Sequence, residues 1–471
     1  MLTIDIDAEG FATLTIDMPG RSMNVIDWNF NSAFDEVMSG LLADIAVKGI
    51  VIVSGKPSFV AGADLAIMKD FLAPGMTPAS ASRKIGEIGQ VLRKFEQGGK
   101  PVVAAASGTA LGGGLELMLA AHYRIAADNP RARFGLPEVT LGLLPGAGGT
   151  QRLPRLIGVA KALPILLNGR PLTVVAAKDA GIIDEIVPPE NLVAAAKAAI
   201  REGRVSAGAP WDIKGYRLPG DQPSSTATLD LFSMTNARML AETQGNYPAP
   251  KAILSCVFEG MRLPIDKGLK IERDYFGTLV TDQIAHRMIR TLFFAHQTAA
   301  KSGWTPGDPA DANVKAGREA YVAEGLHLVR DGAQPDTVEN VARSVGMEKG
   351  PIEIAREQNR DLPEKTSNAT VSIDDIRTRL LTIQALTAAR CLEADGERGA
   401  GHVDLNAVLG WGFPAWLGGP LSFIDAMGAE AFVEQANRLA SRYGRRFQPP
   451  SSVIAQVGKS AGFYETTRSG A

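Results

Sequence analysis

The chain has 471 residues, of which 45% are hydrophobic and 21% charged, a composition typical of a globular protein with two or three domains. The formal net charge of −2 excludes a global basic field for nucleic acid, so an anionic ligand needs a local positive site. Two cysteines, Cys256 and Cys391, exclude a disulfide framework and a cysteine-based zinc site and fit a reducing compartment.

No targeting segment and no membrane span are expected. The N-terminal residues alternate polar and apolar types and lack a basic-then-apolar signal. The most apolar stretch, residues 101–127, is broken by three consecutive glycines and by Glu116, and no uncharged apolar run reaches roughly 18 residues. We therefore expect a soluble, cytoplasmic protein.

The first part of the chain alternates short strands with amphipathic helices. Period-2 patterns on either side of residues 8–10 predict a β-hairpin, and Asp27 is expected to cap the next helix. Helices are also predicted over 78–97 and 115–120. Repeated strand–strand–helix units predict a layered α/β domain that ends near Pro189. Three apolar runs are typical of strands buried on both faces: 49–53, 102–105 and 123–126.

The second part of the chain has helical patterns. A pattern from 192 to about 300 is interrupted near 203–225, and residues 302–314, rich in Pro, Gly and Asp, predict a second linker. Two later segments, 321–351 and 380–420, each combine a helix with a Gly/Pro-rich turn, which suggests a duplicated helical half-domain.

Three glycines, Gly112–Gly114, precede an apolar helix. Such glycines let a backbone approach a ligand closely, and a helix N-terminus presents free N–H groups. The N–H of Gly113 is therefore a candidate donor to an anionic oxygen, and the small residues 61–63 would bring a second N–H beside it. Two such donors form an oxyanion hole, which stabilises a transition state by roughly 3 kcal/mol per donor.

Two glutamates are candidates for acid–base chemistry. Glu116 lies in an apolar helix, where loss of hydration raises a carboxyl pKa towards useful values. Glu138 follows Pro137 in a second Gly/Pro-rich segment, so the two side chains would have to converge from different elements.

Each of these features also has a purely structural interpretation. The glycine run is equally compatible with close packing of a helix, Glu116 with a capping or salt-bridged acid, and Glu138 with a solvated loop. Asp64 is expected to cap a helix over 65–72. Composition and spacing alone leave an acyl-type site as one interpretation among several.

The pattern of these segments resembles the crotonase superfamily of enoyl-CoA hydratases and isomerases. The matching stretches are SFVAGADL (58–65), ASGTALGGGLEL (106–117), FGLPEVTLGLLPGAGGTQRLPRLIG (134–158) and AKDAGIID (177–184). The resemblance covers residues 2 to about 199 and implies an α/β spiral of repeated ββα units that binds an acyl-CoA thioester. It also implies that the N–H groups of Ala61 and Gly113 hold the thioester oxygen.

On this resemblance, the chain hydrates trans-2-enoyl-CoA to 3-hydroxyacyl-CoA in fatty acid β-oxidation. Glu116 would activate water for attack at C3 and Glu138 would protonate C2. Glu138 alone would also serve a Δ3–Δ2 enoyl-CoA isomerase, by moving a proton between C2 and C4. No metal is expected. Four further residues are expected to contact the substrate or its CoA phosphates: Lys56, Ala63, Asp64 and Gly112.

The rest of the chain resembles the multifunctional β-oxidation proteins, which join a crotonase domain to a 3-hydroxyacyl-CoA dehydrogenase. After the crotonase-like domain, the resemblance implies a linker helix and an all-α region like the two helical halves of the dehydrogenase C-terminal part. The expected segments are a crotonase-like domain at 1–199, a helical linker at 200–301, a short linker at 302–314, the dehydrogenase-like half-domains at 315–450 and a flexible tail at 451–471.

The NAD-binding Rossmann domain of those proteins has no counterpart in this sequence. Residues 302–314 take its place and are too short for one βαβ unit of about 30 residues, and no G-x-G-x-x-G follows a predicted strand. The five histidines fall outside any dehydrogenase motif. We therefore predict no cofactor, no NAD binding and no dehydrogenase activity.

Two alternatives to hydration remain open. One is a non-catalytic acyl-CoA-binding or scaffold subunit that docks a thiolase, although a pure binder has no need of two costly acids. The other is a crotonase-fold enzyme with hydrolase or dehalogenase chemistry. The helical region is expected to replace trimer contacts and keep the chain monomeric, by packing on the first domain through four aromatic residues: Trp411, Phe413, Trp416 and Phe423.

Overall fold

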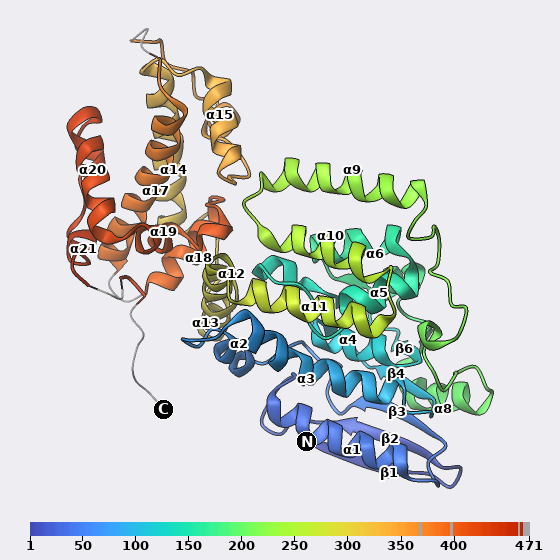
Figure 1. Cartoon of the computed structure of the whole chain (residues 1–471). Helices are drawn as coiled ribbons and strands as arrows, with labels where there is room; N and C mark the ends of the chain where they lie inside the picture. The colour runs from blue at the N-terminus through green and yellow to red at the C-terminus, as the bar shows by residue number, and fades with distance from the viewer. Residues whose placement is uncertain (367–369, 396–398, 460–461, 465–471) are drawn as a thin grey trace. The chain divides into compact units, whose positions relative to one another are not determined.

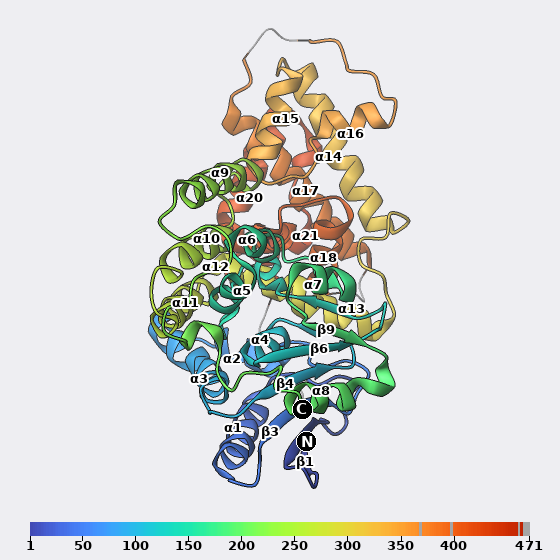
Figure 2. The same ribbon diagram turned by 90° about the vertical axis from the view of Figure 1, so that its right-hand side faces the viewer.

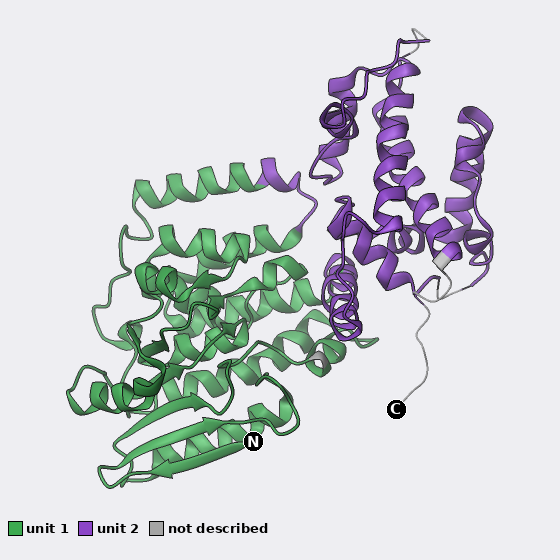
Figure 3. Cartoon of the chain, turned by 180° about the vertical axis from the view of Figure 1, so that it is seen from behind, with its two compact units in different colours: residues 1–239, 248–282 green, residues 240–247, 283–471 purple. Residues whose placement is uncertain are grey.

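A computed structural model describes residues 1–366, 370–395, 399–459 and 462–464. They divide into two compact units, shown in Figure 3. Unit 1 comprises Met1–Met239 and Pro248–Asp282, and unit 2 comprises Leu240–Tyr247 and Gln283–Ala471.

Within the described residues of unit 1, a six-stranded sheet has the order β1-β2-β3-β4-β6-β9. β1 (Leu2–Ile6) and β2 (Phe11–Ile16) pair antiparallel with Leu2 opposite Ile16, which confirms the predicted hairpin. β3 and β4 are buried on both faces, which explains their uninterrupted apolar sequences. The remaining neighbours pair in parallel: β3 (Gly49–Ser54), β4 (Val102–Ala106), β6 (Tyr123–Ala127) and β9 (Glu185–Val187).

Helices connect and cover these strands (Figures 1 and 2). The side chain of Asp27 accepts a hydrogen bond from Phe30 N at 2.7 Å, so it caps α1 as predicted. One helix, α8, packs against β3, β4 and β6. The helices that follow strands of this sheet are α1 (Trp28–Ala43), α2 (Leu65–Phe71), α3 (Pro78–Glu96), α4 (Gly113–Ala120) and α8 (Leu192–Arg201).

A smaller sheet brings two distant sequence segments together. β5 (Ala110–Leu111) pairs in parallel with β7 (Arg133–Gly135), and β7 pairs antiparallel with β8 (Leu172–Thr173). The N–H of Gly112 then donates to the carbonyl of Gly135 at 2.9 Å. The glycine run before α4 therefore lies beside the segment that carries Glu138.

Two helices of the predicted linker (200–301), α10 and α11, pack within unit 1, whereas the residues from Gln283 onward belong to unit 2. α11 packs along α3 and also contacts α5, while α10 packs against α5, α6 and α11 (Figure 1). α9 (Thr226–Thr243) precedes them and passes from unit 1 into unit 2. The four packed helices are α5 (Gly149–Ile157), α6 (Val159–Asn168), α10 (Pro248–Gly260) and α11 (Ile265–Val280).

Unit 2 is built from helices around two apolar clusters. Trp411 and Phe413 are 5% and 1% exposed and belong to one of these clusters, and Trp416 and Phe423 pack against it. Trp411 and Phe413 thus fill the core of unit 2, with Trp416 and Phe423 against it, and a role of these four side chains in packing on the first domain stays a prediction. Its principal helices are α14 (Ala312–Arg330), α17 (Ile373–Asp395), α18 (Ala400–Gly410), α19 (Pro420–Met427) and α20 (Ala429–Tyr443).

The two predicted non-helical segments have different structures. Between α13 (His296–Ser302) and α14 the chain forms turns and irregular backbone without a strand or helix, and Asp311 caps α14. In the predicted tail, Ser451–Ile454 form α21, whereas residues 460–461 and 465–471 lie outside the described residues. No helix in the described ranges is long and apolar enough to cross a membrane.

Candidate active site

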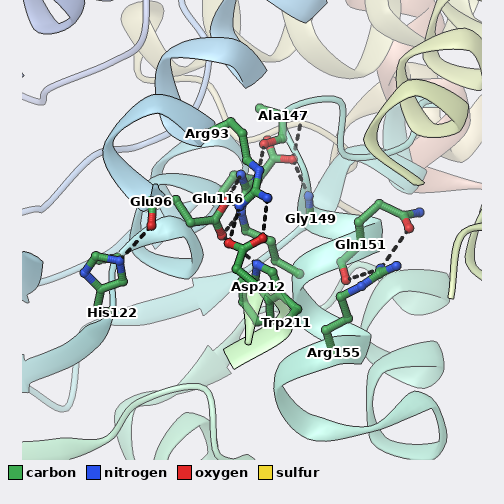
Figure 4. A network of polar contacts seen from close by, with 12 residues as sticks. Arg93, Glu96, Glu116, His122, Ala147, Gly149, Gln151, Arg155, Trp211 and Asp212 are labelled. Carbon is green, nitrogen blue, oxygen red and sulfur yellow. Dashed lines mark hydrogen bonds and ion pairs between the residues drawn. The ribbon is translucent and has the colours of Figure 1, made fainter. Parts of the chain in front are cut away.

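Glu116 is a buried acid at the start of α4. The helix begins at Gly113, directly after Gly112 with its φ of +53°. Glu116 is 3% exposed, and its Oε1 accepts hydrogen bonds from the N–H groups of Ala147 and Gly149, both at 2.8 Å (Figure 4). Burial raises the pKa of Glu116, and the two N–H donors and the positive charge of Arg152 oppose this rise.

Glu138 approaches the same place from a different element. It is the second residue of a 3-10 helix, Pro137–Leu141, which follows β7. A Cβ placed on Gly112 would lie 2.8 Å from Glu138 Oε1, so this carboxyl rests against the N-terminal end of α4. Its Oε2 is closed off from solvent and has no hydrogen-bond partner among the described residues.

The two carboxyl groups influence each other. Burial raises the pKa of Glu138 well above its ordinary value, and the negative charge of Glu116 raises it further. The lower pKa belongs to Glu116, because two N–H donors stabilise its ionised form. The structure thus brings together Glu116, Glu138 and Gly112, and the mutual repulsion of the two acids favours one ionised and one protonated carboxyl group.

Backbone N–H groups border this pair. The N–H of Gly113 has no acceptor in the part of the chain that is described, as is usual in the first turn of a helix. A parallel bridge between Val60 and Ala110 holds the segment around Ala61 and Ala63 beside the glycine run.

The prediction that Ala61 supplies the second donor does not fit the structure. The N–H of Ala61 donates to the carbonyl of Asn24 at 2.8 Å. The N–H of Ala63, two residues later, has no acceptor among the described residues. Ala63 is therefore the donor that is available beside Gly113. Sequence alone does not separate the two alanines, because the partner of a backbone N–H depends on which segment lies next to it.

Asp64 and Lys56, which were predicted to contact the substrate, are engaged within the protein. Asp64 caps α2 by accepting from Ala66 N at 2.8 Å, as predicted for this residue, and also pairs with Arg21. The ammonium group of Lys56 lies 2.8 Å from Asp17 Oδ1. Binding of CoA phosphates by Lys56 stays a prediction. It would require the Lys56 ammonium group to contact a phosphate and Asp17 at the same time.

A third buried carboxylate, Glu272 on α11, lies close to the pair and was not predicted. It is 1% exposed and accepts from the N–H of Thr150 at 2.8 Å and from its hydroxyl at 2.5 Å. Burial raises the pKa of Glu272 to about 8, and the charge of Glu116 adds to the rise. Because Glu272 comes from a helix far along the chain, no local pattern identifies it.

A buried ionic network supports the loop that holds Glu116 (Figure 4). Glu96 is fully buried and accepts from Arg152 at 2.9 and 3.0 Å, from Arg93 at 2.9 Å and from Trp211 at 3.0 Å. Arg152 also donates to the carbonyl of Ala147 at 2.8 Å. The peptide groups on both sides of Ala147 are thereby fixed, one by Arg152 and the other by Glu116.

The described residues contain no group of three or more His, Cys, Asp or Glu side chains that could hold a metal ion.

Known proteins resemble this chain mainly in unit 1. The family model described as enoyl-CoA hydratase/isomerase matches residues 7–206. The fatty acid oxidation complex subunit alpha of Shewanella amazonensis is 40% identical over 317 residues, which are 65% of this chain and 42% of that protein. The same subunit of Shewanella loihica is 40% identical over 318 residues, 67% of this chain and 43% of the relative. The chain thus spans less than half the length of these curated relatives.

Two solved structures are also similar. An enoyl-CoA hydratase from Bacillus anthracis is 24% identical, over 65% of this chain and 97% of that one, with a TM-score of 0.39. Pseudomonas aeruginosa DspI is 30% identical, over 44% of this chain and 81% of that one, with a TM-score of 0.39. At these TM-scores neither structure bears on the chemistry of the site.

Proposed function

We propose that this chain, whose residues 7–206 match the enoyl-CoA hydratase/isomerase family model, hydrates 2-enoyl-CoA thioesters to 3-hydroxyacyl-CoA. The observation that carries this proposal is the convergence of Glu116 and Glu138 at the start of α4. Both have a raised pKa, and they are bordered by two backbone N–H groups, of Ala63 and Gly113, that have no acceptor among the described residues. A protein that only bound acyl-CoA would not need this costly arrangement.

The proposed reaction uses each group once. The N–H groups of Ala63 and Gly113 hold the thioester oxygen as negative charge develops on it. Glu116 accepts a proton from water while the water oxygen bonds to C3, and protonated Glu138 donates its proton to C2. The product then carries both parts of one water molecule, and one proton passing from Glu116 to Glu138 restores the starting state.

Isomerisation is a second candidate activity at the same site. Moving a double bond from Δ3 to Δ2 requires one carboxyl group that removes a proton at C2 and returns it at C4. The Oε2 of Glu138, which has no described protein partner, would serve this step once Glu138 is ionised and its proton rests on Glu116. Hydration needs both acids, whereas isomerisation needs Glu138 alone.

We also propose that the chain lacks dehydrogenase activity and binds no NAD. The segment between α13 and α14, which is fully described, contains no strand and is too short for a βαβ unit. The similar proteins from Shewanella are alpha subunits of a fatty acid oxidation complex, which supports a role in fatty acid β-oxidation; a cytoplasmic location and a thiolase partner are further parts of this proposal. A monomeric state is part of the same proposal.

The test is a direct assay on several enoyl-CoA chain lengths, beginning with crotonyl-CoA, that follows the loss of enoyl absorbance. Release of free CoA thiol is measured in parallel, because it reports hydrolysis, and halide release from a halogenated acyl-CoA reports dehalogenation. Hydration abolished in both Glu116→Gln and Glu138→Gln variants supports the proposal. Acyl-CoA binding without turnover on any of these substrates would identify a scaffold instead.

A further inference from the structure

The N-terminus of α5 is shared between two buried carboxylates from different helices. The N–H of Gly149 donates to Glu116 of α4, whereas the N–H of the next residue, Thr150, donates to Glu272 of α11, both at 2.8 Å. The hydroxyl of Thr150 adds a second bond to Glu272. Since a helix N-terminus carries partial positive charge, both acids draw on the same local field.

Glu272 also faces a cavity. The cavity has a volume of about 200 Å³ and lies between α3 and α11. Gly146 and Ala147 form part of its wall, so the peptide that donates to Glu116 separates this cavity from the acid pair.

We propose that Glu272 is a positioning residue for the Glu116–Glu138 pair: it fixes the first turn of α5, and in its ionised form, at alkaline pH, its negative charge helps Glu138 to keep its proton. This inference rests on the proposed hydration. It extends the site beyond residues 7–206, because α11 lies outside the segment that the family model matches.

The ionisation of Glu272 is coupled to that of the Glu116–Glu138 pair. Its pKa is raised to about 8 by burial and by Glu116, and lowered by Thr150 and Arg152. Its charge in turn raises the pKa of Glu138. The charged and titratable groups on the elements packed around Glu272 are Glu116 on α4, Glu138 on the 3-10 helix, Arg152 and Arg155 on α5, Cys256 and Glu259 on α10, and Arg93 on α3. Arg93 is itself ion-paired with Glu96, Asp212 and Asp266.

The test is Glu272→Gln in the full chain. Glutamine has nearly the same size and still accepts from Thr150 N–H, but it cannot ionise. Hydration requires protonated Glu138 and is lost as the pH rises through its pKa. Removing the neighbouring charge lowers that pKa, so the alkaline limb of kcat/KM should move to lower pH by about one pH unit, with KM within about twofold.

A readout without substrate separates this inference from the proposed function. The protonated carboxyl of Glu138 is identified by infrared difference spectra as the band that Glu138→Gln removes. In Glu272→Gln this band should disappear at lower pH than in the wild type. If the wild type hydrates no enoyl-CoA but the band still shifts, hydration is refuted and the electrostatic role of Glu272 stands.

Glu339→Gln is the matched control. Glu339 is another buried carboxylate at a helix N-terminus, where it accepts from Ile352 N at 2.7 Å, and it lies in unit 2. This variant should leave the profile unchanged. Should Glu272→Gln fail to fold, Thr150→Val weakens the ionised form of Glu272 and should shift the limb in the same direction, while Thr150→Ser should not. A loss of activity that is equal at every pH, or no shift of the band, would overturn the proposal.

Discussion

Gly112 and Glu138 are in direct contact: a Cβ on Gly112 would lie 2.8 Å from the carboxyl oxygen Oε1 of Glu138. Gly112 also has a φ of +53°, in the left-handed region that other residues rarely adopt. The glycine before α4 is therefore needed for two reasons, one conformational and one steric, and the steric reason concerns a proposed catalytic acid.

Gly112→Ala should separate these two reasons. The left-handed backbone should lower the free energy of unfolding by about 1–2 kcal/mol, and displacement of Glu138 should lower kcat/KM by roughly 100-fold. Gly20→Ala is the control, because Gly20 has a φ of +71° with nothing within 4 Å of the added Cβ. Gly20→Ala should lower the free energy of unfolding measured in urea without lowering the hydration activity. Equal activity in both variants would contradict the placement of Glu138.

Replacing either proposed catalytic acid should remove most of the activity. Glu116→Gln and Glu138→Gln should each lower kcat for hydration by roughly 10²–10⁴-fold, the usual contribution of a general acid or base. Glu36→Gln, an exposed glutamate on α1, is the control and should keep wild-type kcat. If Glu138→Gln alone loses isomerase activity while both variants lose hydration, the two reactions share the site as proposed.

The ion pair between Glu96 and Arg152 is fully buried, with both side chains 0% exposed. Arg152→Met leaves Glu96 without a main partner in a dry environment, so the free energy of unfolding should fall by about 3–5 kcal/mol. Arg438→Met breaks the exposed ion pair with Glu434 on α20 and should change the free energy of unfolding by less than about 1 kcal/mol. Urea unfolding measures both. Equal effects would show that the buried network does not stabilise unit 1.

The stability of unit 2 should depend on the protonation of Asp404. Burial raises its pKa to about 6 from an ordinary 3.8, although Leu421 N, Ser422 N and Tyr464 donate to it. The folded state thus binds this proton more tightly than the unfolded state does. Asp404 therefore contributes stability below pH 3.8 that is lost as the pH rises through 6, by about 3 kcal/mol.

Asp404→Asn cannot bind or release this proton. The difference in unfolding free energy between wild type and Asp404→Asn, measured from pH 3 to pH 7 by denaturant titration, should therefore fall across this window. Parallel stability curves for the two proteins would show that Asp404 keeps an ordinary pKa in the folded state.

Oxidation of 3-hydroxyacyl-CoA should be absent. Mixing the protein with a 3-hydroxyacyl-CoA and NAD should produce no NADH absorbance, while the reverse of hydration should still form the enoyl thioester. Hydration rates with and without NAD should agree. NADH formation at a rate comparable to that of hydration would show that a nucleotide site exists elsewhere in the chain.

Local sequence patterns determined a large part of this protein. The strands at 49–53 and 102–105, the hairpin and the cap at Asp27 were predicted, because periodicity and capping depend on neighbouring residues. The same holds for Glu116, since an acid inside an apolar helix is visible in the sequence itself. The glycine run was visible too, because few other residues allow its backbone conformation.

Only the tertiary structure decided which groups face each other at the site. Glu272 reaches it from α11, and nothing in its own segment indicates a partner on α5. The choice between Ala61 and Ala63 depended on the carbonyl of Asn24, which reaches one N–H and not the other. The aromatic residue Trp411 likewise turned out to fill its own unit. In each case the deciding contact joins residues distant in sequence, and such contacts follow from packing in three dimensions rather than from local propensity.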